Sequence, residues 1–362
     1  MRFPWRLRGG PPGRGPGWLT ALTAIALGCS SSADERDLAV GGDDGAEHGE
    51  PWADADGETP TTGSDDEVGD DGVPLDVGGG EPPPDVGGNF EDCPEALPSA
   101  WVLCEDFETI ADPSEVALDY QGLDGAFALV DDVGASGQHS MQVSHREGEP
   151  EAGRMVLSFG VSPIDHGGRP SYAPEATFPE IYWRLRVMTE PGWPSVGPGE
   201  LTRTVAFADA TWAEALIAHL RSPDGDVTVE AVPVTCVSGD EVMCAGFDDQ
   251  GSVESLGSLA GSMPLFAEAQ AGQWHCIEGH LRLNTPGLSD GALEFWIDGE
   301  RQAGRDDLDL RGTWTEYAIN ALVIDNHWPG GAPAPLRRWI DDVVVSTEPI
   351  GCAEDPDDAA AG

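Results

Sequence analysis

Apolar and polar residues alternate one by one over residues 273–302, which is the pattern of β-strands that bury one face. In the first half, one face would carry Trp274, Cys276, Glu278, His280 and Arg282, and the other His275, Ile277, Gly279, Leu281 and Leu283. In the second half, Leu293, Phe295 and Ile297 alternate with Glu294, Trp296 and Asp298. Asn284–Gly287 and Ser289–Gly291 are rich in turn-forming residues, and Asp298-Gly299 begins a further turn. The pattern predicts two strands joined by a polar turn.

Similar short apolar runs between Gly- and Pro-rich turns recur along residues 93–352. The predicted strands are Ala126–Asp131, Ser140–His145, Arg154–Phe159, Ile181–Met188, Thr202–Ala208, Ala215–Arg221, Val227–Pro233, Ala318–Asp325 and Trp339–Ser346. Helical periodicity is weak, with one short helix expected over Pro264–Gln270, and no internal repeat is visible. Many short strands of this kind indicate one all-β sandwich or jelly roll.

Five segments of this region resemble the concanavalin A-like jelly rolls, and most closely the β-jelly-roll polysaccharide lyases and their lectin-like relatives. They are the hairpin string LNTPG…DG..EFWIDG, the strand Ile181–Met188, the segment Ala318–Gly331, the string CEDFE over Cys104–Glu108, and WIDDVVVS over Trp339–Ser346. In that family the strands corresponding to the last two lie near one another. The resemblance implies an all-β jelly-roll sandwich of two antiparallel sheets, and a single domain over residues 93–352.

The charge of the chain excludes nucleic acids as partners, and the absence of lysine excludes lysine as a catalytic residue. Among 362 residues the formal net charge is −48, and all 18 basic residues are arginine because no lysine occurs. Lysine-based catalysis is therefore excluded. A polyanion also repels nucleic-acid phosphates, so we expect no nucleic-acid partner. Adaptation to high salt or the codon usage of a GC-rich genome would explain this acidity.

The N-terminal 28 residues have the pattern of an export signal. Arg2, Arg6, Arg8 and Arg14 precede a short apolar run over Trp18–Gly28, which is too short to span a bilayer. The string Ala-Leu-Gly before Cys29 resembles a bacterial lipobox, which implies cleavage before Cys29 and lipid on its thiol. An ordinary signal peptide with an incidental Cys29 is the alternative. We expect an exported protein, anchored by lipid at the bacterial cell envelope, with the outer membrane preferred.

Residues 29–92 and 353–362 differ from the predicted domain by their Asp, Glu, Gly and Pro content and their scarcity of apolar side chains. Such segments bury too little surface to offset the entropy of ordering. We expect residues 29–92 to form a disordered acidic tether, and residues 353–362 a disordered acidic tail. No segment of the tether has the spacing of a calcium-binding EF-hand loop.

The remaining six cysteines form an even set, as expected of an exported protein with disulfides. Cys236 and Cys244 flank a turn-like Ser-Gly-Asp and are predicted to pair. Cys93, Cys104, Cys276 and Cys352 allow three pairings, which the sequence does not decide. The preferred one joins Cys93 to Cys104 and Cys276 to Cys352.

Three strands offer polar side chains at alternate positions, and in the family that this region resembles the glycan lies across the concave sheet. Tyr182, Arg184 and Arg186 share one strand face, Glu278, His280 and Arg282 share another, and His219 is expected to reach the same surface. We predict a glycan-binding face from these side chains, with an ordinary outer face as the alternative.

The lyase branch of the family implies β-elimination on a uronic-acid polymer. This reaction needs a base, a group that neutralises the carboxylate, and an acid for the leaving oxygen. His280 or His219 would be the base, Arg184 or Arg186 the neutralising group, and Tyr317 or Tyr182 the acid. The lysine and second tyrosine found in some alginate lyases are missing. A hydrolase is disfavoured because Glu294, Asp298 and Glu300 have the wrong spacing for the ExDxxE-like motif of glucanases.

A loop over residues 325–331 suggests binding without catalysis. Asn326, His327 and Trp328 combine an amide, an imidazole and an aromatic face, the groups that recognise sugars. Trp328 filling a gap at the sheet edge is the alternative. No cofactor is required by these patterns, although Glu108, Asp341 and Asp342 are candidate ligands for a structural Ca²⁺.

Taken together, the sequence predicts a monomeric, surface-displayed lipoprotein whose jelly roll binds a polysaccharide. A polysaccharide lyase is the first alternative, and a structural or adhesive protein without a sugar site is the second.

Overall fold

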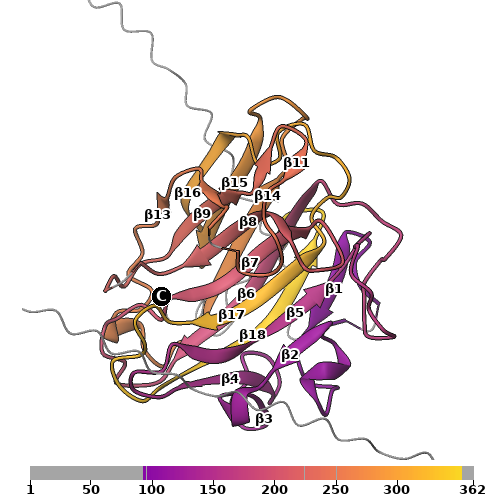
Figure 1. Ribbon diagram of the computed structural model, residues 1–362. Coiled ribbons are helices and arrows are strands. Elements are labelled where there is room, and N and C mark those ends of the chain that lie inside the picture. The colour runs from indigo at the N-terminus through magenta and orange to yellow at the C-terminus, as the bar shows by residue number, and fades with distance from the viewer. Residues whose placement is uncertain (1–92, 95, 224, 250, 353–362) are drawn as a thin grey trace, which may run out of the picture. The chain divides into compact units, whose positions relative to one another are not determined.

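Two large antiparallel sheets contain most of the strands of the described residues and pack face to face as a jelly-roll sandwich (Figure 1). The structure is a computed structural model and describes residues 93–94, 96–223, 225–249 and 251–352. The predicted signal peptide, the lipidation site Cys29, the acidic tether and the C-terminal tail lie outside the described residues.

The first sheet has the strand order β16-β15-β14-β6-β18-β4-β3, and β1 pairs with β18 beside this path. Its strands are β1 (Trp101–Glu105), β3 (Phe127–Val130), β4 (Ser140–His145), β6 (Glu180–Thr189), β14 (His275–Arg282), β15 (Gly291–Ile297), β16 (Glu300–Leu308) and β18 (Leu336–Ser346). The antiparallel pairing of β1 with β18 confirms that the first and last strands of the domain are neighbours.

The second sheet has the order β12-β9-β8-β7-β17-β5-β2, with β13 on β9. Its strands are β2 (Asp119–Gln121), β5 (Glu151–Ser158), β7 (Glu200–Phe207), β8 (Glu214–Arg221), β9 (Glu230–Thr235), β12 (Glu254–Ser255), β13 (Leu259–Ala260) and β17 (Ala321–His327). A small hairpin, β10 (Val237–Ser238) with β11 (Glu241–Val242), follows β9. Three short 3-10 helices complete the regular structure of the described residues: η1 (Pro113–Glu115), η2 (Leu123–Gly125) and η3 (Glu268–Gln270). None of the described helices has the length and apolar character needed to cross a membrane.

The predicted hairpin is confirmed, and its register explains one glycine. β14 pairs with β15 and, on its other side, with β6, which places Gly279 opposite Trp183. A Cβ atom at Gly279 would lie 2.3 Å from the Trp183 ring, so only glycine leaves room for this indole. Trp183 is fully buried and donates a hydrogen bond from Nε1 to Thr202 Oγ1 at 3.2 Å, which joins the two sheets across the core.

The second sheet buries apolar side chains on both faces. One face joins the main core between the sheets, through residues such as Leu216, Ala218 and Leu220. The other face carries a second apolar cluster that includes Val205, Ile217 and Val232. This double burial explains why β8 and β9 contain the apolar runs Ala215–Ala218 and Ala231–Val234 rather than a clean alternation.

Besides short strands such as β2, β12 and β13, which were not predicted, two longer segments differ from the sequence-based expectation. The helix predicted over Pro264–Gln270 is reduced to the single 3-10 turn η3. The polar segment after the Asp298-Gly299 turn forms β16, an unpredicted edge strand that pairs with β15. Its charged residues are compatible with an edge, where one side of the strand lacks a partner.

Candidate functional site: a groove on the second sheet

A groove of about 840 Å³ lies on the face of the second sheet that points away from the main core. The residues that line it come from seven strands and the adjoining loops: Gln121, Leu123, Glu151, Gly153, Arg154, Glu200, Arg203, Ile217, His219, Arg221, Val232, Val234, Asp248, Val253, Ser255, Asp325, His327 and Pro329. Sites for small molecules and oligosaccharides have volumes in this range, roughly 300–1,000 Å³.

Arg203, on β7, is the central charge of the groove. Its Nη2 lies 2.7 Å from Asp325 Oδ2, its Nη1 lies 3.7 Å from Glu214 Oε1, and Asp248 forms a further ion pair with Nη1. Burial lowers the pKa of this guanidinium, but the charges of the three carboxylates outweigh that effect and raise the pKa above its ordinary value. Arg203 therefore stays charged although its side chain is 3% exposed.

His219, on β8, lies next to Arg203 in the register of the sheet and forms the second polar feature. Its Nδ1 lies 3.0 Å from Glu200 Oε2. Burial raises the pKa of Glu200, but the hydrogen bond and charge of His219, with the charges of Arg221 and Arg203, bring it below the ordinary value. An ionised Glu200 can only accept, so Nδ1 carries a proton, and Nε2 is the nitrogen left to exchange a proton with a ligand.

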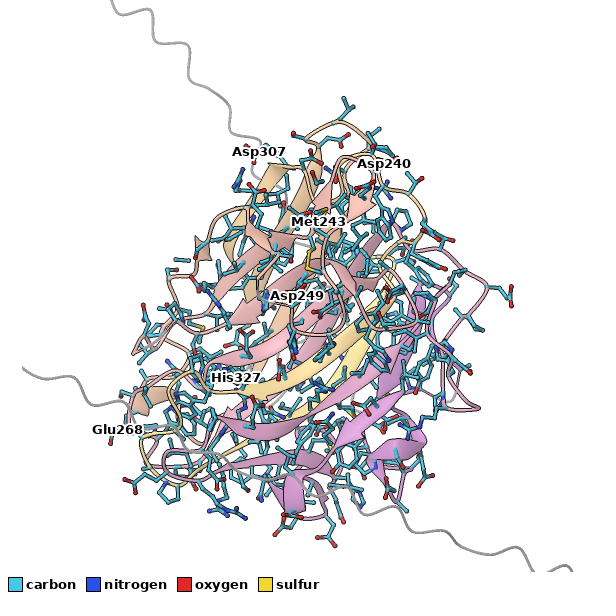
Figure 2. All side chains as sticks on the ribbon, in the orientation of Figure 1. Asp240, Met243, Asp249, Glu268, Asp307 and His327 are labelled. Carbon is cyan, nitrogen blue, oxygen red and sulfur yellow. A yellow bond between two sulfur atoms is a disulfide. The ribbon has the colours of Figure 1, made fainter. Side chains whose placement is uncertain are left out.

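A second imidazole–carboxylate pair lies in the same groove, at the end of β17. His327 Nδ1 lies 2.7 Å from Glu151 Oε1, and both side chains are more than 40% exposed. Figure 2 labels His327 in front of the lower strands of the view.

Arg221, on β8, contacts one carboxylate on each of the two neighbouring strands, β9 and β7. Its Nε lies 2.9 Å from Glu230 Oε1 and its Nη1 lies 3.8 Å from Glu200 Oε1. With 39% of its side chain exposed, Arg221 is much more accessible than Arg203.

The loop between β11 and β12 contacts the groove arginines through Phe247 and Asp248. The Phe247 ring centroid lies 4.2 Å from Arg154 Cζ and 4.5 Å from Arg203 Cζ, in cation–π contact with both. Asp248 forms ion pairs with the same two arginines, and its backbone has a positive φ of 62°. In Figure 2 the neighbouring residue Asp249 lies in front of the central strands of the second sheet.

Two further carboxyl groups under the groove have raised pKa values. Burial raises the pKa of Asp325, against the opposing charge of Arg203. Burial likewise raises the pKa of Glu214 to about 6, again opposed by Arg203. The charge of Arg203 therefore makes it possible to keep carboxylates at buried positions of this sheet.

The polar face predicted on β6 and β14 exists, but it belongs to the first sheet. The register pairs Tyr182 with His280 and Arg184 with Glu278, as the alternation predicts. His219 belongs to the second sheet, so the prediction that it reaches this surface is wrong. The main core separates the two faces.

Other segments of the chain pack on much of this face of the first sheet. Glu278 accepts hydrogen bonds from the backbone N–H groups of Ile350 and Gly351 at 2.8 and 2.9 Å, and Arg184 donates to the Gly351 carbonyl at 3.1 Å. The residues just before the end of the described chain therefore cover Glu278 and Arg184. This arrangement gives both side chains a structural role.

The other predicted residues of this face also have protein partners. Arg186 pairs with Asp342 at 3.1 Å, and Arg282 donates to the Asp290 carbonyl at 3.1 Å. His280 lies 2.8 Å from Glu180 and its ring stacks on Tyr182 at a centroid distance of 4.2 Å.

The four residues proposed for lyase chemistry do not converge. Tyr317 lines a separate pocket of about 170 Å³ beside Arg311, whereas His280, Arg184 and Arg186 lie on the first sheet. None of the four lines the groove of the second sheet. The sequence pattern correctly placed His280, Arg184 and Arg186 on one sheet, but it could not show that Tyr317 lies in a separate pocket.

Two of the three residues of the predicted sugar-binding loop are buried. Trp328 is 5% exposed, and its ring packs near Trp193 and His145, with centroid distances of 6.0 and 5.1 Å. Asn326 is fully buried and donates to the Gly153 carbonyl at 2.9 Å. The stacking role predicted for Trp328 is corrected to packing, and of the three residues His327 alone lines the groove.

The carboxylates considered for calcium have hydrogen-bond and ion-pair partners. Glu108 lies 2.8 Å from His139 Nδ1, Asp342 accepts from Ser136 at 2.5 Å, and Asp341 accepts from the backbone of Ala135 at 2.7 Å. In the described part of the chain, no group of three or more Asp, Glu, His or Cys side chains is arranged to hold a metal ion. The calcium prediction is therefore not supported for these side chains.

All three preferred disulfides are confirmed: Cys93–Cys104, Cys236–Cys244 and Cys276–Cys352. The second closes the hairpin that precedes Phe247 and Asp248, and the third attaches the end of the described chain to β14.

Sequence reasoning missed most of the charged residues of the groove, among them Arg154, Glu200 and Arg203. A signal was present, because Arg203 is the one charged residue of LTRTVAFA and His219 interrupts the apolar run ALIAHL. In a strand buried on both faces, an isolated charge must find partners, and such a position is a candidate site.

Searches of protein-family models and of curated proteins return no match to this chain. Among solved structures, the chain is similar to an endo-β-1,4-glucuronan lyase from the fungus Trichoderma reesei, at 10% identity and a TM-score of 0.45, over 68% of this chain and 95% of that chain. It is also similar to an alginate lyase from Aplysia kurodai, at 14% identity and a TM-score of 0.46, over 69% and 100% of the two chains. An alginate lyase from a Chlorella virus has 11% identity and a TM-score of 0.45, over 68% and 99%. The two packed antiparallel sheets by themselves define the jelly-roll fold of this chain.

Proposed function

We propose that this chain binds a polysaccharide along the groove of the second sheet. The observation that carries the proposal is the composition of the groove, which places hydrogen-bonding charged pairs next to an apolar strip. The strip is formed by Ile217, Val232 and Val234, and the polar side includes His219 and Arg221.

A sugar ring presents both kinds of surface. Its hydroxyls donate to carboxylates and accept from guanidinium and imidazole groups, and its C–H faces pack on apolar side chains. Because the protein carboxylates, imidazoles and guanidiniums already hold one another in place, the groove requires little ordering when a ligand binds.

The proposal is tested by measuring the affinity of an oligosaccharide panel for the wild type and for matched pairs of variants. His219→Ala and Arg221→Ala should each weaken binding by about tenfold or more, since each removes a hydrogen bond that involves a charged pair. His280→Ala and Arg282→Ala remove the same side chains from the first sheet and should leave the affinity unchanged. Equal losses from both pairs would place the binding surface elsewhere, and no binding by any oligosaccharide would favour a structural or adhesive role.

A second candidate is a polysaccharide lyase, favoured by the pair His219–Glu200. Glu200 holds the ring by Nδ1, so Nε2 is oriented as a general base, the group that β-elimination requires at the sugar C5. Among the described residues no tyrosine lines the groove, so His327 is the available candidate for the acid.

The lyase candidate is tested with uronic-acid polymers, because each cut creates an unsaturated end that absorbs in the ultraviolet. If His219 removes the proton, His219→Ala should lower this rate by about two orders of magnitude. Absorbance that does not rise with any such polymer would leave binding as the function.

We also infer export and lipid anchoring through Cys29. The three disulfides support an oxidising compartment, as found outside the cytosol. A tethered domain at the cell envelope would meet the polysaccharides of its surroundings.

A further inference from the structure

The cations of the groove are already bound by protein carboxylates. Arg203 contacts Asp325, Glu214 and Asp248, as described above. Arg154 Nη2 lies 3.4 Å from Asp119 and its Nη1 lies 3.8 Å from Asp248. Arg221 contacts Glu230 and Glu200.

Carboxylates therefore outnumber arginines in and next to the groove, since Asp119, Glu214 and Glu230 contact its arginines without lining it themselves. The three arginines that line its described part share six carboxylates between them. A seventh, Glu151, pairs with His327. Seven carboxylates exceed the three arginines and two imidazoles together, so the groove and its immediate surroundings have an excess of negative charge. The surrounding chain adds to it, because residues 93–352 contain 42 acidic residues and 13 arginines.

Asp248 occupies the position that a carboxylate of a ligand would need. It contacts both Arg154 and Arg203, and its side chain is 46% exposed, whereas Asp325 and Glu214 are nearly buried within the sheet. Arg203 Nε is buried and has no hydrogen-bond partner, so the guanidinium still has an unused donor. An incoming uronate would have to displace Asp248 before it could reach these arginines.

We propose that the groove selects a glycan that carries free amino groups and rejects uronic-acid polymers, and that Asp248 sets this preference. This inference rests on the proposed polysaccharide binding and narrows it to one chemical class. An ammonium group gains from the excess of carboxylates, while a uronate is repelled by them and finds the arginines occupied. It also makes the lyase candidate less favourable, because a lyase must accept uronates.

The first experiment compares three hexasaccharides by calorimetry: glucosamine, N-acetylglucosamine and galacturonate oligomers. The glucosamine hexamer should bind about tenfold more tightly than its acetylated form, and the galacturonate should bind most weakly. Added salt should reduce the glucosamine advantage, because the Debye length falls from about 10 Å at 0.1 M to about 3 Å at 1 M.

The second experiment uses Asp248→Asn with Asp240→Asn as a charge-matched control. Asp240 lies exposed in the turn between β10 and β11, and Figure 2 labels it away from His327 and Asp249. Asp248→Asn should reduce the preference for glucosamine over galacturonate by about tenfold, whereas the control should retain it.

The two proposals fail in different ways. Galacturonate binding as tightly as glucosamine, or equal affinity for the two glucosamine forms, would overturn the inference and leave polysaccharide binding intact. If the Asp248→Asn variant kept the full preference for glucosamine over galacturonate, Asp248 would not be the residue that sets it. No binding by any of the three, or by the wider panel, would remove polysaccharide binding and the inference with it.

Discussion

Arg338 shows how a single buried charge supports the groove from the core side. It lies on β18 of the first sheet, is fully buried, and reaches across the core to the second sheet. Its Nη2 donates to the carbonyl groups of Glu200 and Asp325 at 2.9 and 3.2 Å and to Asn326 Oδ1 at 2.7 Å. Burial lowers its pKa to about 10, which still leaves the guanidinium charged at neutral pH. The backbone beneath the groove is thereby held by a residue of the opposite sheet.

Two buried carboxyls make stability depend on pH. Burial raises the pKa of Glu105 to about 7, and burial together with Asp342 raises that of Asp341 to about 8. Between the ordinary carboxyl pKa of about 4 and these raised values, both groups are protonated in the folded chain and ionised in the unfolded chain. Their contribution to stability is therefore lost as pH rises through that range. Burial and the charge of Arg338 lower the pKa of His145 to about 3, so its contribution is lost instead as pH falls below about 6.5.

We therefore expect the free energy of unfolding to fall between pH 6.5 and 8, by on the order of 1–2 kcal/mol. Chemical denaturation across this range measures the slope. Asp341→Asn should flatten it, because one of the two titrating groups is gone, while Asp240→Asn at an exposed turn should not. A slope that is identical in all three proteins would contradict the assignment to Asp341.

At the scale of elements, disulfides fix segments that the sheets alone would leave loosely attached. Cys276–Cys352 spans 76 residues and joins the end of the described chain to β14, where Glu278 also binds it. Cys236–Cys244 spans eight residues and closes the hairpin before the Asp248 loop. A crosslink over a longer loop removes more entropy from the unfolded chain.

Removing the long crosslink should thus cost more than removing the short one. We expect the pair Cys276→Ala and Cys352→Ala to lower the free energy of unfolding by about 4 kcal/mol, and the pair Cys236→Ala and Cys244→Ala by about 2.5 kcal/mol. Denaturant unfolding of the two double variants measures both values. The reverse order would show that native-state contacts, rather than loop length, determine these contributions.

At the scale of the whole molecule, a strongly acidic domain follows an acidic segment and the lipidation candidate Cys29, which lies outside the described residues. The charge keeps such a chain soluble and separate from anionic surfaces. Attachment to an envelope would then depend on the lipid.

Cys29→Ser should accordingly release the protein from the membrane fraction into the soluble fraction, since the residual segment cannot hold it there. Cell fractionation with detection of the domain measures this, and Ser30→Ala is the control that keeps the thiol. Retention of Cys29→Ser in the membrane fraction would contradict the anchor.

The local pattern of the sequence located most of the longer strands of this protein, because side-chain alternation depends on neighbours along the chain. It located the β14–β15 hairpin, the shared face of Tyr182 and His280, and the turn that Cys236 and Cys244 close. It also supported the all-β sandwich and the pairing of the first and last strands, through the resemblance of the strings at Cys104–Glu108 and Trp339–Ser346 to a known family.

Tertiary structure alone decided which strands share a sheet and which face stays open. His219 and His280 have the same local pattern, yet one lines the groove and the other lies on the opposite sheet. The charged network of Arg154, Arg203 and Asp248 joins residues 45 to 94 positions apart, and Trp328 became a core residue through contacts with distant segments. Such long-range pairings depend on strand order and on the packing of two sheets, and neither is encoded in the periodicity of a single segment.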